Sequence, residues 1–202
     1  MKNTSSYSSD TLVIEGGSRL KGTVRISGAK NASLPILFAS ILTNERCEIE
    51  DVPELVDTKN ACELLQILGA YVYRRGESVV VEPSGIYSFD TPSHIVRRMR
   101  ASILSMGPLL GRFNRARVAL PGGCSIGLRP IDQHLKFFAK AGAQIVNGKD
   151  SVNLTIERRR PVDFEFDLVT VTGTENALLY LSTVDGESVI KNIAIEPEVM
   201  TS

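Results

Sequence analysis

The chain has 202 residues, enough for one sizeable domain or two small ones, and 43% of the residues are hydrophobic. It carries 23 Lys and Arg against 23 Asp and Glu, so its formal net charge is zero. This balance argues against nucleic-acid binding through a general basic surface, although it leaves room for a local basic pocket. No apolar run approaches the ~18 residues of a membrane-spanning helix, so we expect no membrane segment.

The first eleven residues, which begin "MKNTSSYSSD", are polar and lack the apolar stretch of a signal peptide. We therefore expect a flexible N-terminal tail over 1–11. The chain has 3 cysteines, an odd number and widely spaced, which favours neither a disulfide framework nor a CxxC metal site. A reducing cytoplasm is the expected location.

An internal repeat determines the expected architecture. The stretch "LLQILGAYVYRRGESVVV" at 64–81 aligns without gaps with "FFAKAGAQIVNGKDSVNL" at 137–154. Gly69 matches Gly142 in this alignment, and the alanine that follows each glycine also matches. Each copy predicts the end of a helix, a Gly-Ala turn and a β-hairpin.

Two further pairs of segments extend the repeat. "VRISGAKNA" at 24–32 is similar to "VTVTGTENA" at 169–177, and both predict a β-branched strand that ends in glycine before a helix. "CEIEDV" at 47–52 resembles "SVIKNI" at 188–193. We infer an α/β (α+β) domain over 12–202 built from three βαβαββ units that bury their faces against one another. The units span about 12–83, 88–157 and 163–202, and the third stops before its second helix and hairpin.

Cys124 lies among glycines in "LPGGCSIGLRP", between a predicted strand, "RARVAL" at 115–120, and a predicted helix through "IDQHLKFFAKAGA". Arg129 and the N-terminus of that helix both supply positive potential, which favours a reactive thiolate or a bound anion. The alternative is a turn cysteine without a function. Cys47 and Cys62 fall within a strand and a helix, where packing is the better interpretation.

Lys30 and Asn31 follow Gly28 at a predicted junction between a strand and a helix. A lysine at a helix N-terminus can bind a phosphate or carboxylate together with free backbone N–H groups. The spacing is not that of a Walker motif, and a solvated lysine is an equally good interpretation.

Arg97, Arg98 and Arg100 lie on a predicted helix, and periodicity alone cannot choose which of them faces a ligand. The apolar stripe of that helix is Ile95, Met99, Ile103, Met106 and Leu110. Asp132 and His134 fall in the first turns of the helix after Arg129. A lone histidine there is more often a surface or capping residue than a catalyst. We find no Ser/His/Asp grouping, metal-ligand cluster or dinucleotide fingerprint in the sequence.

Taken in order, "SGAKNASLPIL", "MRASI", "LPGGCSIGLRPIDQH", "GTEN" and "EPEV" resemble the UDP-N-acetylglucosamine enolpyruvyl transferases. The resemblance begins at Leu12 and covers about the first half of a family member. It implies an inside-out α/β barrel of three repeated units, with the active site between this domain and a second one. That second domain, which supplies a general-base aspartate and further arginines, would be needed to complete the site.

The resemblance also implies an activity: the enolpyruvyl group of phosphoenolpyruvate is transferred to UDP-N-acetylglucosamine and phosphate is released, without a metal or organic cofactor. Cys124 would donate a proton and form a covalent adduct, and it would be the target of a fosfomycin-type epoxide. Lys30, Asn31 and Arg129 would contact phosphoenolpyruvate. The residues implied for the nucleotide sugar are Arg100, Arg129, Pro130, Ile131, Asp132, Gln133, Leu168, Val169, Thr170 and Val171.

The chain departs from other members at Leu168 and Thr170, where they carry lysine and serine, which puts those contacts in doubt. Two other functions stay open. One is a nucleotide-sugar or anion-binding module without catalysis, and the other is a transferase like enolpyruvylshikimate-phosphate synthase, which lacks the cysteine loop.

Overall fold

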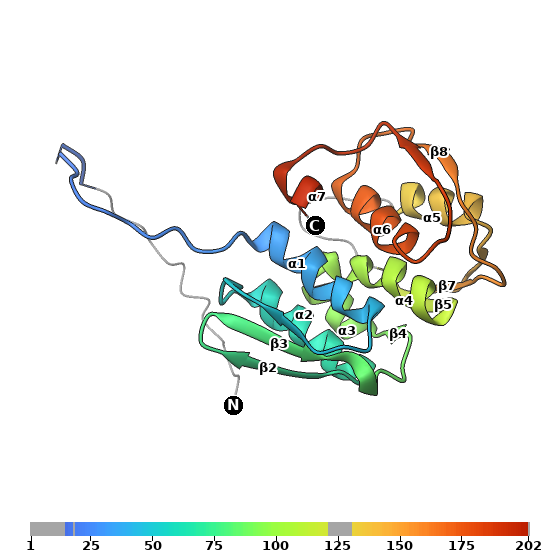
Figure 1. The fold of residues 1–202 in the computed structure, drawn as a ribbon, viewed down its shortest axis with the longest axis horizontal. Coiled ribbons are helices and arrows are strands. Elements are labelled where there is room, and N and C mark those ends of the chain that lie inside the picture. Colours follow the sequence, from blue (N-terminus) through green and yellow to red (C-terminus); the bar gives the residue numbers. More distant parts are fainter. Residues whose placement is uncertain (1–14, 18, 121–130, 202) are drawn as a thin grey trace, which may run out of the picture.

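The computed structural model describes residues 15–17, 19–120 and 131–201, which form a mixed α/β fold (Figure 1). The helices are α1 (Lys30–Ala39), α2 (Val56–Leu68), α3 (Ser93–Arg98), α4 (Met106–Phe113), α5 (Asp132–Lys140), α6 (Val171–Leu181) and α7 (Pro197–Thr201). Three short 3₁₀ helices are η1 (Ser40–Leu42), η2 (Pro83–Gly85) and η3 (Arg100–Ser105). The strands are β1 (Cys47–Ile49), β2 (Tyr71–Arg75), β3 (Ser78–Glu82), β4 (Asp90–Thr91), β5 (Arg115–Ala119), β6 (Gln144–Asn147), β7 (Ser151–Thr155), β8 (Asp163–Glu165) and β9 (Val189–Lys191).

The strands of the described residues form three separate sheets around the helices. The first has the order β1-β3-β2, the second β4-β5-β7-β6, and the third pairs β8 with β9. The pairs β4–β5 and β8–β9 are parallel, whereas both hairpins are antiparallel. Figure 1 shows α1, α4 and α6 in the middle of the molecule, between the β2–β3 hairpin and β8.

The two predicted helix–hairpin repeats are confirmed. α2 leads into β2 and β3, and α5 leads into β6 and β7. The matched glycines adopt the same left-handed conformation, with φ of 113° at Gly69 and 96° at Gly142. A side chain is strained in that conformation, which explains why both copies place glycine at the end of the helix. The boundaries of the three units remain predictions.

The strands predicted within 24–28 and 169–172 are wrong. Residues 24–28 are extended but pair with no strand among the described residues, and Val24 and Ile26 are 80% and 82% exposed. The second segment, 169–172, contains no strand, and the nearest strand before it is β8. The helix starts here instead: the Thr170 hydroxyl accepts from the Gly173 N–H at 3.2 Å, and α6 begins at Val171.

The single helix predicted along the stripe from Ile95 to Leu110 is divided into α3, η3 and α4. Met99 is extended, with φ of −142°, and separates the first two. The Ser105 hydroxyl donates to the Ser102 carbonyl at 2.7 Å, which competes with the regular helical bond. All five residues of the stripe are nevertheless buried, so the prediction of the apolar face was right although that of the continuous helix was wrong.

An aromatic cluster packs α5, α6 and β8 together. Phe137 lies at its centre and contacts Phe138, Phe164, Phe166 and Tyr180, with ring centroids 5.2 to 6.4 Å apart. The pair with Phe166 is stacked and the other three are edge-to-face, and both arrangements add to the hydrophobic stabilisation of the core. The cluster therefore fixes the relative positions of α5 and α6, whose N-terminal ends carry most of the described residues expected to bind substrate.

Candidate functional site

Most of the described candidate residues lie at the N-termini of three helices. Lys30 is the first residue of α1, Asp132 is the first residue of α5, and Thr170 is the N-cap of α6. The first N–H groups of a helix lack partners within it, and the helix dipole makes that end positive. The same ends therefore favour anions such as phosphates and carboxylates.

Gln133 joins the start of α5 to the segment before α6. Its side-chain amide donates to Asp132 at 3.0 Å and to Asp167 at 3.1 Å, and its Oε1 accepts from the Asp167 N–H at 3.0 Å. Lys136 also pairs with Asp167 and, together with Gln133, lowers the pKa of that carboxyl. These bonds hold residues 168–170 beside the α5 N-terminus, so two predicted groups for the nucleotide sugar are brought together.

His134 is 2% exposed and its Nε2 lies 3.2 Å from the Thr172 hydroxyl, so the surface or capping interpretation is wrong. Burial, with a further contribution from the nearby charge of Arg100, lowers the pKa of His134 to about 4. The ring is therefore neutral at pH 7, and Arg100 belongs to the same group of residues. Arg98 instead donates to Glu63 at 2.9 Å on the exposed surface. Arg100 thus lies near the start of α5 and Arg98 on the exposed surface, and a ligand contact from Arg100 stays a prediction.

Lys30 and Asn31 form the α1 side of the site. Lys30 Nζ lies 3.0 Å from Asp57 on α2, and the Asn31 amide donates to Glu198 on α7 at 3.5 Å. α7 packs against both α1 and α6. The α1 N-terminus is therefore linked to α6 through a short helix, and the Lys30 ammonium already has an acidic partner.

Leu168 and Val169 lie just before α6 and are 69% and 59% exposed. They form an apolar edge of the candidate site. Neither side chain is charged, so no positive charge comes from these two positions.

Cys124, Arg129 and Pro130 lie outside the described residues. Ile131, the next residue, is the N-cap of α5. The other two thiols, Cys47 and Cys62, are half-buried, and burial raises the pKa of both. Within the described ranges, no three His, Cys, Asp or Glu residues are grouped as metal ligands. None of the helices described is long and apolar enough to span a bilayer.

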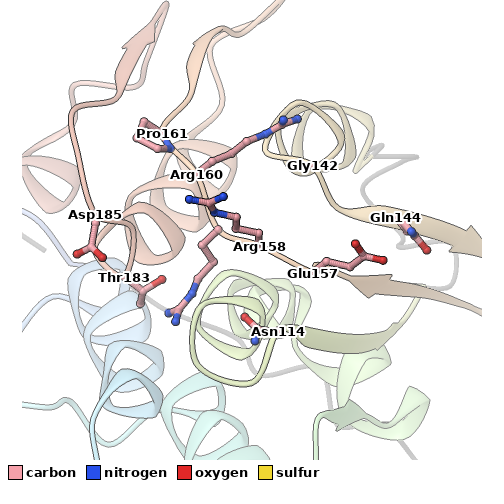
Figure 2. A pocket seen from close by; sticks show the side chains of 10 residues that line it. Asn114, Gly142, Gln144, Glu157, Arg158, Arg160, Pro161, Thr183 and Asp185 are labelled. Atoms are coloured by element: carbon pink, nitrogen blue, oxygen red, sulfur yellow. The ribbon is translucent and has the colours of Figure 1, made fainter.

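A cavity of about 720 Å³ lies at the opposite, C-terminal ends of the helices (Figure 2). Asn114, Gly142 and Thr183 line it at the ends of α4, α5 and α6. Arg159 donates to the Gly111 carbonyl at 2.5 Å, and Arg160 extends towards Gly142 (Figure 2). Arg159 thus binds a carbonyl near the end of α4, which is a stabilising arrangement at the negative end of a helix dipole.

Sequence reasoning interpreted His134 as a surface or capping residue and overlooked three acidic residues, Asp167, Glu175 and Glu198. The only signal for the last two was their presence in the quoted segments "GTEN" and "EPEV". Glu175 is 3% exposed, and burial together with the charges of Glu198 and Glu196 raises its pKa to about 7. A periodicity argument cannot identify such a group, because its neighbour on α7 lies 23 residues further along the chain.

The chain is similar to curated proteins named UDP-N-acetylglucosamine 1-carboxyvinyltransferase. It is 49% identical over 190 residues to the protein of Desulfosudis oleivorans, covering 94% of this chain and 46% of that protein. It is 44% identical over 191 residues to the protein of Desulfatibacillum aliphaticivorans, covering 95% and 46% respectively. The chain therefore spans about half the length of the curated relatives it matches.

Solved structures show the same fold at low sequence identity. The enolpyruvyl transferase NikO from Streptomyces tendae matches with a TM-score of 0.77 at 24% identity, over 93% of this chain and 44% of that one. EPSP synthase from Acinetobacter baumannii matches with a TM-score of 0.66 at 15% identity, over 89% and 42%. The family model described as EPSP synthase (3-phosphoshikimate 1-carboxyvinyltransferase) matches residues 14–202. With nearly the whole chain matched, this protein belongs to the EPSP synthase family.

Proposed function

We propose that this chain is one half of a transferase that moves the enolpyruvyl group of phosphoenolpyruvate to UDP-N-acetylglucosamine and releases phosphate. This would be the first committed step of peptidoglycan synthesis, in the cytoplasm. The relatives that share 44–49% of its sequence carry that enzyme's name. The inside-out barrel stays part of this proposal, as does a second domain that completes the site.

The observation that carries the proposal is the meeting of the α5 and α6 N-termini, joined by the Gln133–Asp167 and His134–Thr172 contacts. Both proposed substrates are anionic, and a neutral protein needs focused positive charge to bind them. Arg100, beside His134, adds a cation to the helix ends. We assign this end to the nucleotide sugar, with contacts from Arg100, the run 129–133 and the segment 168–171.

Lys30, Asn31 and Arg129 are proposed to bind phosphoenolpyruvate near the α1 N-terminus. Protonation of the enol carbon requires a positioned acid, which we assign to Cys124. Bound phosphate beside this thiol favours its neutral form, whereas an empty site with Arg129 nearby favours the thiolate. Cys124 would therefore be the residue that an epoxide of the fosfomycin type alkylates.

Two measurements on the purified 202-residue chain test the proposal. Calorimetry with UDP-N-acetylglucosamine should detect binding that Arg100→Ala weakens and Arg98→Ala does not. A phosphate-release assay with both substrates should show no turnover, because the assigned base and further arginines belong to a second domain. Release of phosphate that is lost in Cys124→Ser would overturn the requirement for that domain.

One alternative has a specific observation in its favour. Lys30 is paired with Asp57, as expected for a solvated lysine in a nucleotide-sugar-binding module without catalysis. Adding the second half of a relative distinguishes the two functions. Turnover supports the transferase, and tight nucleotide-sugar binding without turnover supports the module. Preference for shikimate 3-phosphate over the nucleotide sugar would indicate the third possibility, a synthase of the shikimate type.

A further inference from the structure

Three successive polar residues in α6 are buried, and each faces a different segment. Thr174, Glu175 and Asn176 are 0%, 3% and 0% exposed. The Thr174 hydroxyl accepts from the Ala194 N–H at 3.1 Å. The Asn176 side chain donates to the Ile103 carbonyl at 3.0 Å and accepts from the Gly107 N–H at 2.8 Å. This run therefore connects α6 both to the segment before α7 and to η3, where Arg100 lies.

Glu175, in the middle of the run, faces the glutamates of the segment that leads into α7. The charges that act on it are those of Glu198 and Glu196, which add to the effect of burial. Glu196 Oε2 is itself buried and has no hydrogen-bond partner within the described residues. Glu198 accepts the hydrogen bond from the Asn31 amide. Because α7 packs against α6, Glu198 lies between that helix and Asn31, a residue assigned to phosphoenolpyruvate.

We propose that Glu175 is a positioning residue: in its neutral form it allows Glu198 to lie against α6, where Glu198 orients the side-chain amide of Asn31. This inference rests on the proposed function, because Asn31 acquires its role from that proposal. It goes further by assigning a role to a buried carboxyl that touches neither substrate.

The physical basis is like-charge repulsion in a poorly solvated contact. Once Glu175 ionises, three carboxylates share one contact between α6 and the 196–198 segment, and each penalises the other two. α7 has only 5 residues, too few for a stable isolated helix, so its position depends on its packing against α1 and α6. Its displacement would remove the acceptor from the Asn31 amide.

Other charged groups on the surrounding elements have different partners. Arg112 on α4 donates to backbone carbonyls, Lys30 on α1 pairs with Asp57, and Lys136 on α5 pairs with Asp167. Arg100 on η3 and Asp132 on α5 both act on His134, which is neutral. None of these charges is among those that shift the pKa of Glu175. Glu196 and Glu198 therefore oppose the ionisation of Glu175, and the basic groups named above do not compensate for this repulsion.

The first experiment needs no substrate. Backbone hydrogen exchange, corrected for the intrinsic effect of pH, is measured over 194–201 between pH 6 and pH 8. We expect protection in the wild type to fall about tenfold as pH rises, and Glu175→Gln to keep its protection throughout, since glutamine mimics the neutral acid. Glu157→Gln, which removes an exposed carboxylate at the other end of the helices, should behave like the wild type. Equal pH dependence in wild type and Glu175→Gln would overturn the proposal.

The second experiment adds the second half of a relative and measures the dissociation constant of phosphoenolpyruvate in the presence of UDP-N-acetylglucosamine over the same pH range. The dissociation constant of the wild type divided by that of Glu175→Gln should rise about tenfold from pH 6 to pH 8. Glu198→Gln should likewise remove the pH dependence of the dissociation constant that the wild type shows. A ratio that does not change with pH overturns the role of Glu175 and leaves the proposed function untouched. Absence of phosphoenolpyruvate binding in every variant at every pH overturns the proposed function and, with it, this role. The exchange experiment then still reports whether the Glu175 contact responds to pH.

Discussion

The two ends of α5 and α6 use polar residues in different ways. At the N-terminal ends, Gln133 and His134 join the helices, so the positive helix field faces the candidate site together with Arg100. Near the C-terminal ends, Arg159 donates to the backbone carbonyl of Gly111 on the neighbouring helix α4. The same residue type therefore has two roles. An arginine at a helix C-terminus donates hydrogen bonds to carbonyls and stabilises the fold, whereas one beside a helix N-terminus adds to a field that attracts anions.

The largest expected effect is a loss of nucleotide-sugar binding at the N-terminal ends of α5 and α6. Arg100→Ala should weaken UDP-N-acetylglucosamine binding about 100-fold, the scale of losing a charge-assisted contact worth ~3 kcal/mol. Titration calorimetry measures the loss. Arg98→Ala is the matched control, because Arg98 makes an exposed ion pair with Glu63 that contributes little. Equal losses in both variants would mean that Arg100 does not belong to the site.

At the other end of the helices, Arg112→Ala should cost stability rather than binding. Arg112 donates to the carbonyls of Ile41 and Thr43 at 2.8 Å and to that of Pro83 at 3.3 Å. Removing it leaves several half-buried acceptors without their donor, so we expect the free energy of unfolding to fall by about 2 kcal/mol. Urea unfolding measures this, with Arg158→Ala as a nearly neutral control, because Arg158 is an exposed arginine that lines the cavity at the C-terminal ends of the helices. Lost binding at unchanged stability would contradict the division between the two ends.

The two perturbed groups near the N-terminal ends should give opposite pH dependences of stability. His134 has a pKa lowered to about 4, so its contribution is present above pH 6.5 and is lost as pH falls towards 4. Glu175 has a pKa raised to about 7. Its contribution is present below about pH 4.5 and is lost as pH rises towards 7. The wild type should therefore show a shallow profile in which the two trends partly cancel.

Substitution should separate these trends. His134→Gln should leave stability falling as pH rises from 4.5 to 7, and Glu175→Gln should leave stability rising from pH 4 to 6.5. We expect differences of about 1 to 2 kcal/mol, because solvent screening reduces the effect of the shifts. Urea unfolding at half-unit pH intervals measures both profiles. Parallel profiles in the two variants would show that these groups are not perturbed in opposite directions.

The helix–hairpin repeats and the apolar faces could be predicted because they depend on local patterns. Gly69 and Gly142 mark the helix ends by their backbone conformation, and the stripe from Ile95 to Leu110 is buried as its periodicity required. Residues 24–28 have the composition of a strand, but a strand also needs a partner, and local propensity does not supply one. The same limit applies to 169–172, where a capping threonine overrides the β-branched pattern.

The candidate site was only partly predictable for a similar reason. Lys30 and Asp132 could be assigned to helix starts from neighbouring residues, and both helices begin where expected. The contacts that join one helix start to another depend on distant residues. His134 on α5 and Thr172 on α6, for example, are 38 positions apart in the sequence. Burial of His134 and Glu175 depends on how α5, α6 and α7 pack. A single sequence shows their residue types without showing their neighbours.

The smallest expected effect concerns the thiols and extends the comparison to the start of α5. Cys47 and Cys62 are half-buried in β1 and α2, and burial raises the pKa of both, so few of these thiols are ionised at pH 7.5. Cys124 precedes Arg129 and the α5 N-terminus in the sequence, where positive potential favours a thiolate. Limiting iodoacetamide should therefore label Cys124 several-fold faster, as measured by mass spectrometry of peptides. Bound phosphate should reduce this preference by opposing the thiolate charge. Faster labelling of Cys47 or Cys62 in the folded protein would show that the α5 N-terminus does not activate the thiol.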